Sequence, residues 1–338
     1  MAKRNRVRRW IQKTVKRKIF WILLALLIFV YLNNSSLLAQ PRAGEPLLLA
    51  HRGLAQTFDI AGLKNESCTA ARIHPPEHSY LENTVSSMRA AFEAGADVVE
   101  FDVQLTADDR FAVFHDRTLD CRTNGSGMIR DHTMEELKGL DIGYGYTADG
   151  GKTFPFRGTG VGRMPSLDEV LSAFPHRSFL IHVKSEDREE GVKLAQRLSS
   201  LPADRLQRLT VYGGDKPIAA LQEHLPDLRT MSLASMKSCL LPYIAIGWTG
   251  AVPEACEQTQ LHLPAQIAPW IWGWPDRFLN RMDRAGTRVI VVRYVDGFSG
   301  GFDTAEDLKR LPSDFIGGIW TNRIDRVAPL LKGETERN

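Results

Sequence analysis

Histidines and charged side chains gather where short apolar segments of this sequence come to an end. Four pairs stand out by their position: His51 with Arg52, Glu100 with Asp102, His115 with Asp116, and His182 with Lys184. Short apolar segments are typical of buried parallel strands, so each pair is expected in a strand or at its carboxyl end. In a barrel of parallel strands those ends form one mouth, where such enzymes hold their active sites. The positions therefore predict a single site built from all four pairs.

Glu100 and Asp102 lie two residues apart on one expected strand, which turns both carboxylates to the same face. Buried carboxylates are costly unless a metal ion or opposite charges compensate them. Oxygen ligands suit Ca²⁺, Mg²⁺ or Mn²⁺, so the pair predicts a site for a divalent ion. The alternative is a carboxylate pair that Arg52 and Lys184 neutralise.

His51 and His115 are expected beside these carboxylates, and imidazoles exchange protons near neutral pH, so they are candidates for a general acid and a general base. Arg52 and Lys184 suit the oxygens of a phosphate group, where negative charge develops during transfer. Six other histidines fall in expected loops or helices, and we interpret them as surface or structural residues: His74, His78, His132, His176, His224 and His262.

The elements that must position these residues alternate between strands and helices. Strands are expected over residues 47–50, 97–103, 111–114, 179–183, 209–212, 229–233, 266–269, 288–292 and 318–320. Helices of about ten to fifteen residues between such strands indicate parallel βα units. About eight units over roughly 270 residues favour an α/β fold of the TIM (β/α)8 barrel type over an open doubly wound sheet.

Polar residues mark helix starts and loops around the expected mouth. Asn83 or Thr84 is expected to cap one helix, and Ser166 with Glu169 forms a capping box that opens a second helix over 167–174. Residues 54–81 and 143–162 are turn-rich. Long loops in compact domains usually have a function, so we expect both to be insertions that cover the barrel mouth.

The N-terminal residues differ in composition from the rest of the chain. Nine Lys or Arg lie between Lys3 and Lys18, and an apolar run follows over residues 19–32. This pattern predicts a basic cytoplasmic segment over 1–18 and a transmembrane signal anchor over 19–39, then a linker over 40–46 and the barrel over 47–332. The alternatives are a signal peptide cleaved at Ala39 and a buried core helix. The barrel is expected outside the cytoplasm, periplasmic or extracellular, and secreted if the segment is cleaved.

The net charge of +3 conceals two parts of opposite sign. Residues 1–44 contain ten basic and no acidic residues, whereas the remainder contains 33 basic and 40 acidic residues. A mildly acidic body argues against a nucleic-acid partner. The expected partners are therefore a small-molecule substrate and, through the N-terminal helix, a membrane. The sequence does not indicate an oligomeric state.

Four cysteines occur, and none of them forms a Cys-x-x-Cys pair. An even number of cysteines in an exported domain favours disulfides. We expect Cys68–Cys121 and Cys239–Cys256, because each bond would hold a local insertion. Four free buried thiols are the alternative.

Three stretches of the sequence resemble the glycerophosphodiester phosphodiesterase family. They read "LLLAHRG", "LENTVSSMRAAFEAGADVVEFDVQLTADDRFAVFHDRTLDCRTNGSG" and "MPSLDEVL". The order of His-Arg-Gly, Glu-Asn-Thr, Glu-x-Asp and His-Asp is highly specific. The resemblance is clear over residues 47–184, faint between about 205 and 315, and visible again in "GGIWTN" at the last expected strand.

The resemblance implies a TIM barrel that hydrolyses glycerophosphodiesters to glycerol 3-phosphate and an alcohol, with one divalent ion, Ca²⁺ or Mg²⁺. The residues that it implies are Glu100 and Asp102 as metal ligands, His51 and His115 as the acid–base pair, Arg52 and Lys184 as phosphate contacts, and Glu82 near the metal or the substrate hydroxyls.

Three features depart from the family pattern. His182 stands where a glutamate is usual as a third metal ligand. Either His182 binds a softer ion such as Mn²⁺ or Zn²⁺, or the third ligand comes from elsewhere. The loop after His-Arg-Gly is unusually long and contains Cys68, and "VIVVRYVDG" lacks the expected tryptophan. These departures leave two other functions open. One is a lysophospholipase D type of hydrolysis of lysophospholipids, and the other is a non-catalytic, membrane-tethered protein that binds phosphodiesters.

Overall fold

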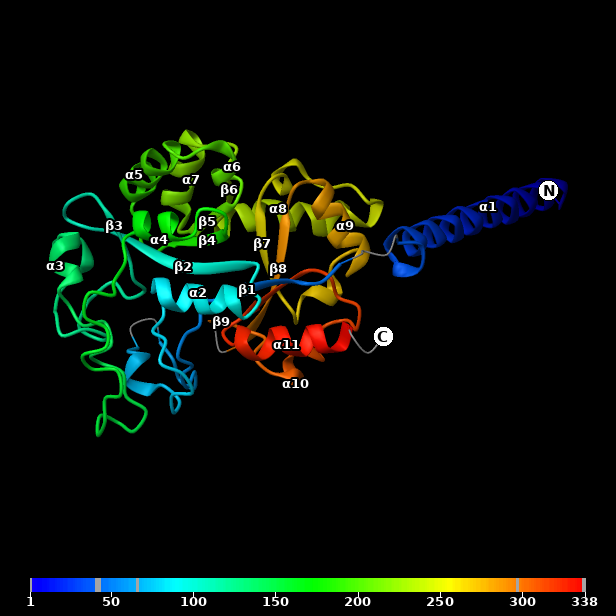
Figure 1. Ribbon diagram of the computed structural model, residues 1–338. Coiled ribbons are helices and arrows are strands. Elements are labelled where there is room, and N and C mark those ends of the chain that lie inside the picture. The colour runs from blue at the N-terminus through cyan, green and yellow to red at the C-terminus, as the bar shows by residue number, and fades with distance from the viewer. Residues whose placement is uncertain (1, 40–43, 65–66, 296–297, 336–338) are drawn as a thin grey trace.

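The computed structural model describes residues 2–39, 44–64, 67–295 and 298–335, and its centre is a closed ring of parallel strands (Figure 1). The ring consists of β1 (Leu47–Ala50), β2 (Val98–Leu105), β4 (Ser178–Val183), β5 (Leu209–Gly213), β6 (Arg229–Met231), β7 (Gln260–Pro264), β8 (Arg288–Val295) and β10 (Gly318–Thr321). Their order is β6-β5-β4-β2-β1-β10-β8-β7, and a parallel bridge between Thr230 and Thr259 joins β6 to β7. The predicted TIM barrel is confirmed.

Helices surround the ring and bury its outer face. They are α2 (Val85–Glu93), α3 (Met134–Lys138), α4 (Leu167–Ala173), α5 (Arg188–Ser199), α6 (Ala203–Leu206), α7 (Asp215–His224), α8 (Leu233–Ile246), α9 (Asp276–Arg284), α10 (Ala305–Leu308) and α11 (Ile324–Thr335). Thr84 caps α2 and Ser166 caps α4, each by accepting a hydrogen bond from a backbone N–H three residues on, as predicted.

The strands of the ring have two packed faces. Phe101 on β2 and Phe179 on β4 point outward, where Phe179 also meets Phe92 of α2 edge to face. A smaller apolar cluster fills the ring interior with Leu49, Val98, Leu180, Ile290, Val292 and Trp320. This alternation along β2 places Glu100 and Asp102 on the interior face, because both are even-numbered steps from Val98.

Two predicted strands differ from the structure. Residues 111–114 were expected in the barrel, but β3 (Phe111–Val113) pairs antiparallel with the end of β2 and lies outside the ring. The strand expected over 266–269 is wrong, because these residues form a turn that enters the 3-10 helix η6 (Ala268–Trp270). Pro269 has no N–H for a sheet and suits the first turn of a helix. A second antiparallel strand, β9 (Phe298–Gly300), pairs with β8.

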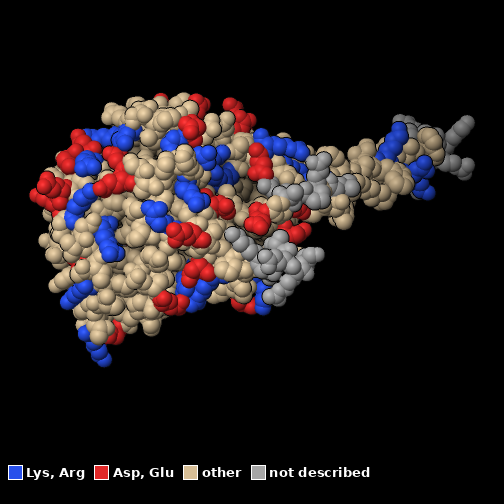
Figure 2. Space-filling model, in the orientation of Figure 1, with Lys and Arg blue, Asp and Glu red and all other residues tan. Residues whose placement is uncertain are grey.

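The N-terminal helix α1 (Ala2–Asn34) projects from the barrel, and a short 3-10 helix, η1 (Ser36–Leu38), follows it (Figures 1 and 2). Asn33 and Asn34 donate to the carbonyl of Trp248 at 3.1 and 2.8 Å, and Arg281 of α9 donates to the carbonyl of Asn33 at 2.8 Å. Within the described part of the chain, no helix is both long and apolar enough to cross a membrane, so the span predicted over 19–39 is not found. Residues 40–43 of the predicted linker lie outside the described residues.

Both predicted disulfides are present, Cys68–Cys121 and Cys239–Cys256. The first joins the loop after β1, next to the 3-10 helix η2 (Ala70–Arg72), to the segment between β3 and the 3-10 helix η3 (Ile129–Asp131). The second joins α8, which the 3-10 helix η4 (Gly247–Thr249) follows, to the 3-10 helix η5 (Glu254–Cys256). Disulfides persist in oxidising compartments, so the pair indicates an extracytoplasmic domain.

On the face shown in Figure 2, acidic and basic side chains of the barrel are intermixed.

Candidate active site

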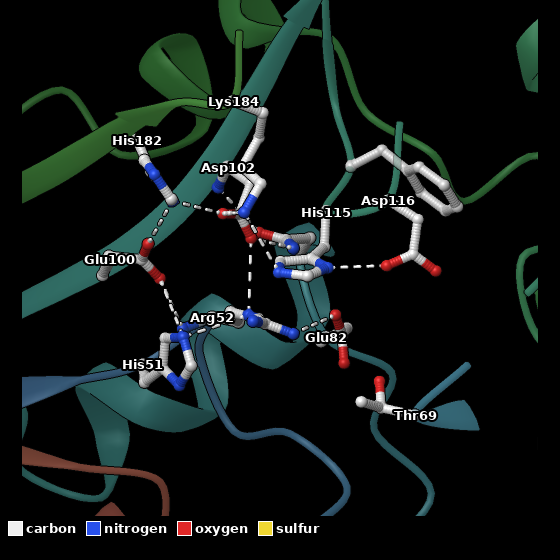
Figure 3. A network of polar contacts seen from close by, with 12 residues as sticks. His51, Arg52, Thr69, Glu82, Glu100, Asp102, His115, Asp116, His182 and Lys184 are labelled. Atoms are coloured by element: carbon white, nitrogen blue, oxygen red, sulfur yellow. Dashed lines mark hydrogen bonds and ion pairs between the residues drawn. The ribbon is translucent and has the colours of Figure 1, made fainter. Parts of the chain in front are cut away.

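The carboxyl ends of neighbouring strands bring the predicted site residues together (Figure 3). His51 and Arg52 follow β1, Glu100 and Asp102 lie on β2, and His182 and Lys184 lie on and just after β4. The parallel register sets Asp102 directly beside His182. His115 and Asp116 enter from the residues after β3, which folds back along β2. The predicted gathering of all four pairs is thus present, with β3 approaching from outside the ring.

Glu100, Asp102 and His182 form a candidate cation site. Their ligand atoms all lie within 4.8 Å of one another. His182 Nδ1 is 2.9 Å from Asp102 Oδ1 and 3.8 Å from Glu100 Oε1, and Figure 3 shows the three side chains turned toward one another. Both carboxylates are fully buried, whereas His182 is partly exposed at the edge of the site. Two carboxylates and one imidazole nitrogen fit a divalent cation.

The electrostatics of this carboxylate pair also suit a cation. Burial raises the pKa of Glu100, and the neighbouring carboxylate of Asp102 raises it further. Burial acts the same way on Asp102, but His115, Lys184 and Arg52, together with a hydrogen bond from His182, outweigh it and hold the Asp102 pKa well below its usual range. Without a further positive charge, Glu100 therefore tends to keep its proton, and a divalent ion would supply that charge.

The protein's own cations lie close to only one of the two buried carboxylates, Asp102. Arg52 Nε lies 3.4 Å and Lys184 Nζ lies 3.8 Å from oxygens of Asp102. Glu100, in contrast, accepts hydrogen bonds from the Tyr212 hydroxyl at 2.7 Å and from the Arg52 backbone N–H at 3.1 Å. These donors orient Glu100 without bringing a full charge to it, so neutralisation by Arg52 and Lys184 accounts for Asp102 better than for Glu100.

His51 is held in one tautomer. Its Nδ1 lies 2.7 Å from Asn322 Oδ1. The amide nitrogen of Asn322 donates to Asp303 at 2.8 Å, which fixes the amide so that its oxygen faces His51. An amide oxygen can only accept, so Nδ1 carries the proton. The Nε2 atom therefore carries the lone pair, and it accepts a hydrogen bond from Arg52 Nε at 3.1 Å. Burial and the adjacent Arg52 charge hold the pKa of His51 well below its usual range. His51 is thus neutral at neutral pH, with a proton acceptor facing the site.

His115 has a charged partner instead. Its Nδ1 donates to Asp116 Oδ1 at 2.6 Å, and its Nε2 faces Lys184 Nζ at 3.2 Å. Burial and Arg52 lower the pKa of His115, while Asp102 and the hydrogen bond to Asp116 oppose that shift. Both histidines therefore present Nε2 to the same space, but only His115 has a carboxylate behind it that stabilises an imidazolium.

Arg52 and Asn83 adopt backbone conformations that are uncommon for residues other than glycine. Their φ angles are +58° and +59°, in the left-handed region. The Asn83 N–H donates to the Arg52 carbonyl at 3.0 Å, and the Asn83 amide donates to Asp102 Oδ2 at 2.9 Å. Such conformations persist where surrounding contacts hold them, often at functional sites. Here they direct Arg52 toward the carboxylates.

Glu82 lies beside the candidate cation site and not among its ligand atoms. Its two oxygens accept from Arg52 at 3.0 Å and from Arg122 at 3.1 Å. Sequence reasoning did not identify Arg122 as part of this network. It also missed Tyr212 and Asn322, although both lie at strand ends, the signal that located the other residues.

His262 corrects the sequence interpretation. We expected it among surface or structural residues outside the strands, but it lies on β7, with its ring 5.5 Å from that of Tyr212 and 5.2 Å from that of Trp320. Burial and the nearby His182 lower its pKa to about 3. The strand expected at 266–269 hid this position. The signal that could have found it is the alternation of Leu261, His262 and Leu263, which is typical of a half-buried strand.

Fold and site together define a TIM-barrel protein with a candidate metal centre at the carboxyl ends of its strands. The model of the Glycerophosphoryl diester phosphodiesterase family matches residues 51–236, which is more than half of the chain. The chain belongs to this family.

Individual relatives agree with the family assignment. A glycerophosphodiester phosphodiesterase of Caldanaerobacter subterraneus is 42% identical over 30% of this chain and 39% of its own length. One of Bacillus subtilis is 30% identical over 51% of this chain and 64% of its own length. The chain thus matches less than two thirds of the length of these two relatives. A solved phosphodiesterase of Oleispira antarctica superposes with a TM-score of 0.54 at 16% identity, over 86% of this chain and 97% of that one, and supports the fold.

Proposed function

We propose that this protein is a phosphoric diester hydrolase that converts glycerophosphodiesters to glycerol 3-phosphate and an alcohol. One observation carries the proposal: two imidazoles present Nε2 beside a buried carboxylate pair, with Arg52 and Lys184 within the same space. Family membership supports it, as do the names of the two bacterial relatives. The Oleispira antarctica phosphodiesterase was solved in complex with the product sn-glycerol-3-phosphate.

In this proposal the chain binds the phosphodiester through its cationic side chains. Arg52 and Lys184 contact phosphate oxygens and neutralise charge that develops on them. Glu100, Asp102 and His182 would hold the divalent ion, which when bound polarises the phosphoryl group as a Lewis acid. Glu82 keeps Arg52 in place through their ion pair at 3.0 Å.

The two histidines exchange the protons. We assign His51 as the general base, because burial and the adjacent Arg52 charge lower its pKa and its Nε2 carries the lone pair. We assign His115 as the general acid, because Asp116 stabilises its protonated form. His51 Nε2 takes the proton of the nucleophile, either water or the adjacent glycerol hydroxyl, and protonated His115 delivers one to the leaving alkoxide.

The donor set also bears on the identity of the ion. Ca²⁺ or Mg²⁺ follows from the family resemblance, but Ca²⁺ prefers an all-oxygen shell. An imidazole among the three donors suits Mn²⁺ or Zn²⁺ better. We propose that Mn²⁺ or Zn²⁺ supports at least as much activity as Ca²⁺.

A metal-by-substrate assay on the full chain tests these proposals. Chelator-treated protein is supplied with each ion in turn, and choline release from glycerophosphocholine and from lysophosphatidylcholine is compared. We expect turnover of glycerophosphocholine, and a loss of roughly 10²–10⁴-fold in both His51→Ala and His115→Ala. Release from lysophosphatidylcholine alone would favour the lysophospholipase D alternative. Binding without turnover under every ion would favour the non-catalytic one, and unchanged turnover in both histidine variants would refute the assigned roles.

We further propose that α1 attaches the extracytoplasmic barrel to a lipid surface. Its large apolar side chains, among them Phe20, Trp21 and Leu27, are exposed to solvent. Exposed apolar helix surface of this kind is expected to enter the interface of a bilayer. Flotation of the full chain with anionic vesicles should fall when Trp21 and Leu27 are both changed to Asp, and equal flotation of the two proteins would contradict the proposal.

A further inference from the structure

Arg122 is one of the largest fully buried side chains of the protein, and its guanidinium makes four hydrogen bonds to side chains. It donates to Asp116 Oδ2 at 2.8 Å, to Glu82 Oε2 at 3.1 Å, to the Tyr146 hydroxyl at 2.7 Å and to Thr69 Oγ1 at 2.6 Å. A rigid planar fork with several donors can bridge partners in this way, which a lysine cannot do.

The two carboxylates of this set lead directly to the proposed active site (Figure 3). Asp116 uses one oxygen for Arg122 and the other for His115 Nδ1, at 2.6 Å. Glu82 likewise uses one oxygen for Arg122 and the other for Arg52, at 3.0 Å. One guanidinium therefore fixes both the orientation of an imidazole and the position of a phosphate-binding arginine.

A covalent constraint holds this guanidinium in turn. Arg122 follows Cys121 and Thr69 follows Cys68, and these two cysteines form a disulfide. The bond therefore holds the two chain segments side by side where Arg122 donates to Thr69. Gly145 packs so closely against the Cys121 carbonyl that a side-chain carbon there would collide with it, which leaves little room for the segment to shift. Cys68 lies in the long loop that follows β1.

We propose that Arg122 is a positioning residue for His115 and Arg52, and that the Cys68–Cys121 disulfide holds Arg122 in that position. The proposal rests on the hydrolase function proposed above. Loss of the guanidinium would leave the buried Glu82 and the partly buried Asp116 without a shared partner, so both would turn away from their present orientation. Loss of the disulfide alone would keep the charges and release the constraint.

The chain offers a matched control, because its second disulfide joins α8 to η5, away from this network. We would compare the double variants Cys68→Ser/Cys121→Ser and Cys239→Ser/Cys256→Ser in the full chain. Kinetic constants for glycerophosphocholine are measured at a temperature where both remain folded by circular dichroism. We expect the first variant to lose about 10–100-fold in kcat, as losses of orienting partners do, and the control to keep kcat while its Tm falls.

Two further variants separate positioning from a merely structural role. Asp116→Asn interrupts only the His115 branch, so kcat should fall and its pH profile should shift while KM stays near that of the parent. Arg122→Lys disturbs both branches, so kcat should fall and KM should rise together. Should Arg122→Lys fail to fold, the two disulfide variants decide the question.

The outcomes are distinguishable from failure of the proposed function. A parent protein without turnover of any glycerophosphodiester refutes the function itself. The positioning role is then tested by calorimetric binding of sn-glycerol 3-phosphate, which the Cys68→Ser/Cys121→Ser variant should weaken and the control should not. An active parent whose Cys68→Ser/Cys121→Ser variant keeps kcat, KM and pH profile overturns the positioning proposal. Equal activity losses in both disulfide variants also overturn it.

Discussion

Replacing His182 by glutamate would give the candidate cation site the third carboxylate that the family resemblance implies at this position. His182 Nδ1 lies 2.9 Å from Asp102 Oδ1 and 3.8 Å from Glu100 Oε1, and its ring stacks on Tyr212 with a centroid distance of 4.1 Å. A glutamate of similar reach therefore brings a negative charge to within a few ångströms of two buried carboxylates. The consequence should depend strongly on whether a cation is present.

The size of the effect follows from these distances. Two unit charges about 4 Å apart interact by about 4 kcal/mol at an effective dielectric constant of about 20. Proton uptake by Glu100 relieves part of this repulsion, so about 4 kcal/mol is an upper limit for the destabilisation of the metal-free variant. At about 2–4 °C per kcal/mol, Tm should fall by several degrees. A divalent ion is attracted by the same added charge, so Ca²⁺ should bind at least about tenfold more tightly, which is 1.4 kcal/mol.

Thermal unfolding measures both halves of this prediction. The parent, His182→Glu and His182→Gln are stripped with chelator and unfolded alone, with Ca²⁺ and with Mn²⁺. His182→Gln is the matched control, because it changes the ring without adding charge. We expect His182→Glu to have the lowest Tm without metal and the largest rise with Ca²⁺. If Ca²⁺ raises the Tm of His182→Glu no more than that of the parent, His182 does not face a bound cation and the reasoning is refuted.

Three other changes probe single contacts. Tyr212→Phe removes the donor to Glu100 Oε1 and should weaken metal affinity about 10–100-fold by titration calorimetry, while an unchanged affinity would show that this hydrogen bond does not orient the ligand. Asn322→Ala frees the His51 ring and should lower kcat by about 10–100-fold with little change in Tm, and a fall in Tm without a fall in kcat would contradict it. Arg323 and Arg326 lower the pKa of Glu77 from its usual 4.5 to about 2. Glu77 therefore stabilises the fold above about pH 4.5, so Glu77→Gln should have the lower Tm at pH 7, and the gap should close as pH falls toward 2. A gap that does not vary with pH would exclude this ion pair as its cause.

The part of the site that the sequence predicted is the part encoded by local patterns. Glu100 and Asp102 share a face because strand side chains alternate, and His51 and His182 are placed by the ends of apolar runs. Such local patterns predict the position of a side chain correctly even where the pairing of its strand is predicted wrongly. Phe111–Val113 reads as another barrel strand, yet it pairs antiparallel with β2, and His115 still reaches the site because it follows that strand directly.

What the sequence did not show depends on contacts between distant segments. Arg122 follows a cysteine in a turn-rich stretch, and nothing in that stretch shows that its side chain bridges Glu82 and Asp116. His262 was missed for a different reason. The strand was expected over 266–269, several residues after the observed β7, so an interior position was read as part of a loop. Both cases need the register of the whole barrel before the side chain's direction can be known.

The charges gathered at the mouth explain why an imidazole at position 182 is compatible with the proposed phosphodiester binding. The network contains four carboxylates, Glu82, Glu100, Asp102 and Asp116, and three cationic side chains, Arg52, Arg122 and Lys184. With all four carboxylates ionised, one negative charge is left. A divalent ion converts this into one positive charge, which a singly charged phosphodiester neutralises. A glutamate at position 182 would leave the loaded site neutral before substrate arrives, so His182→Glu should strengthen Ca²⁺ binding yet raise the KM for glycerophosphocholine. A lower KM in that variant would contradict this view of the site.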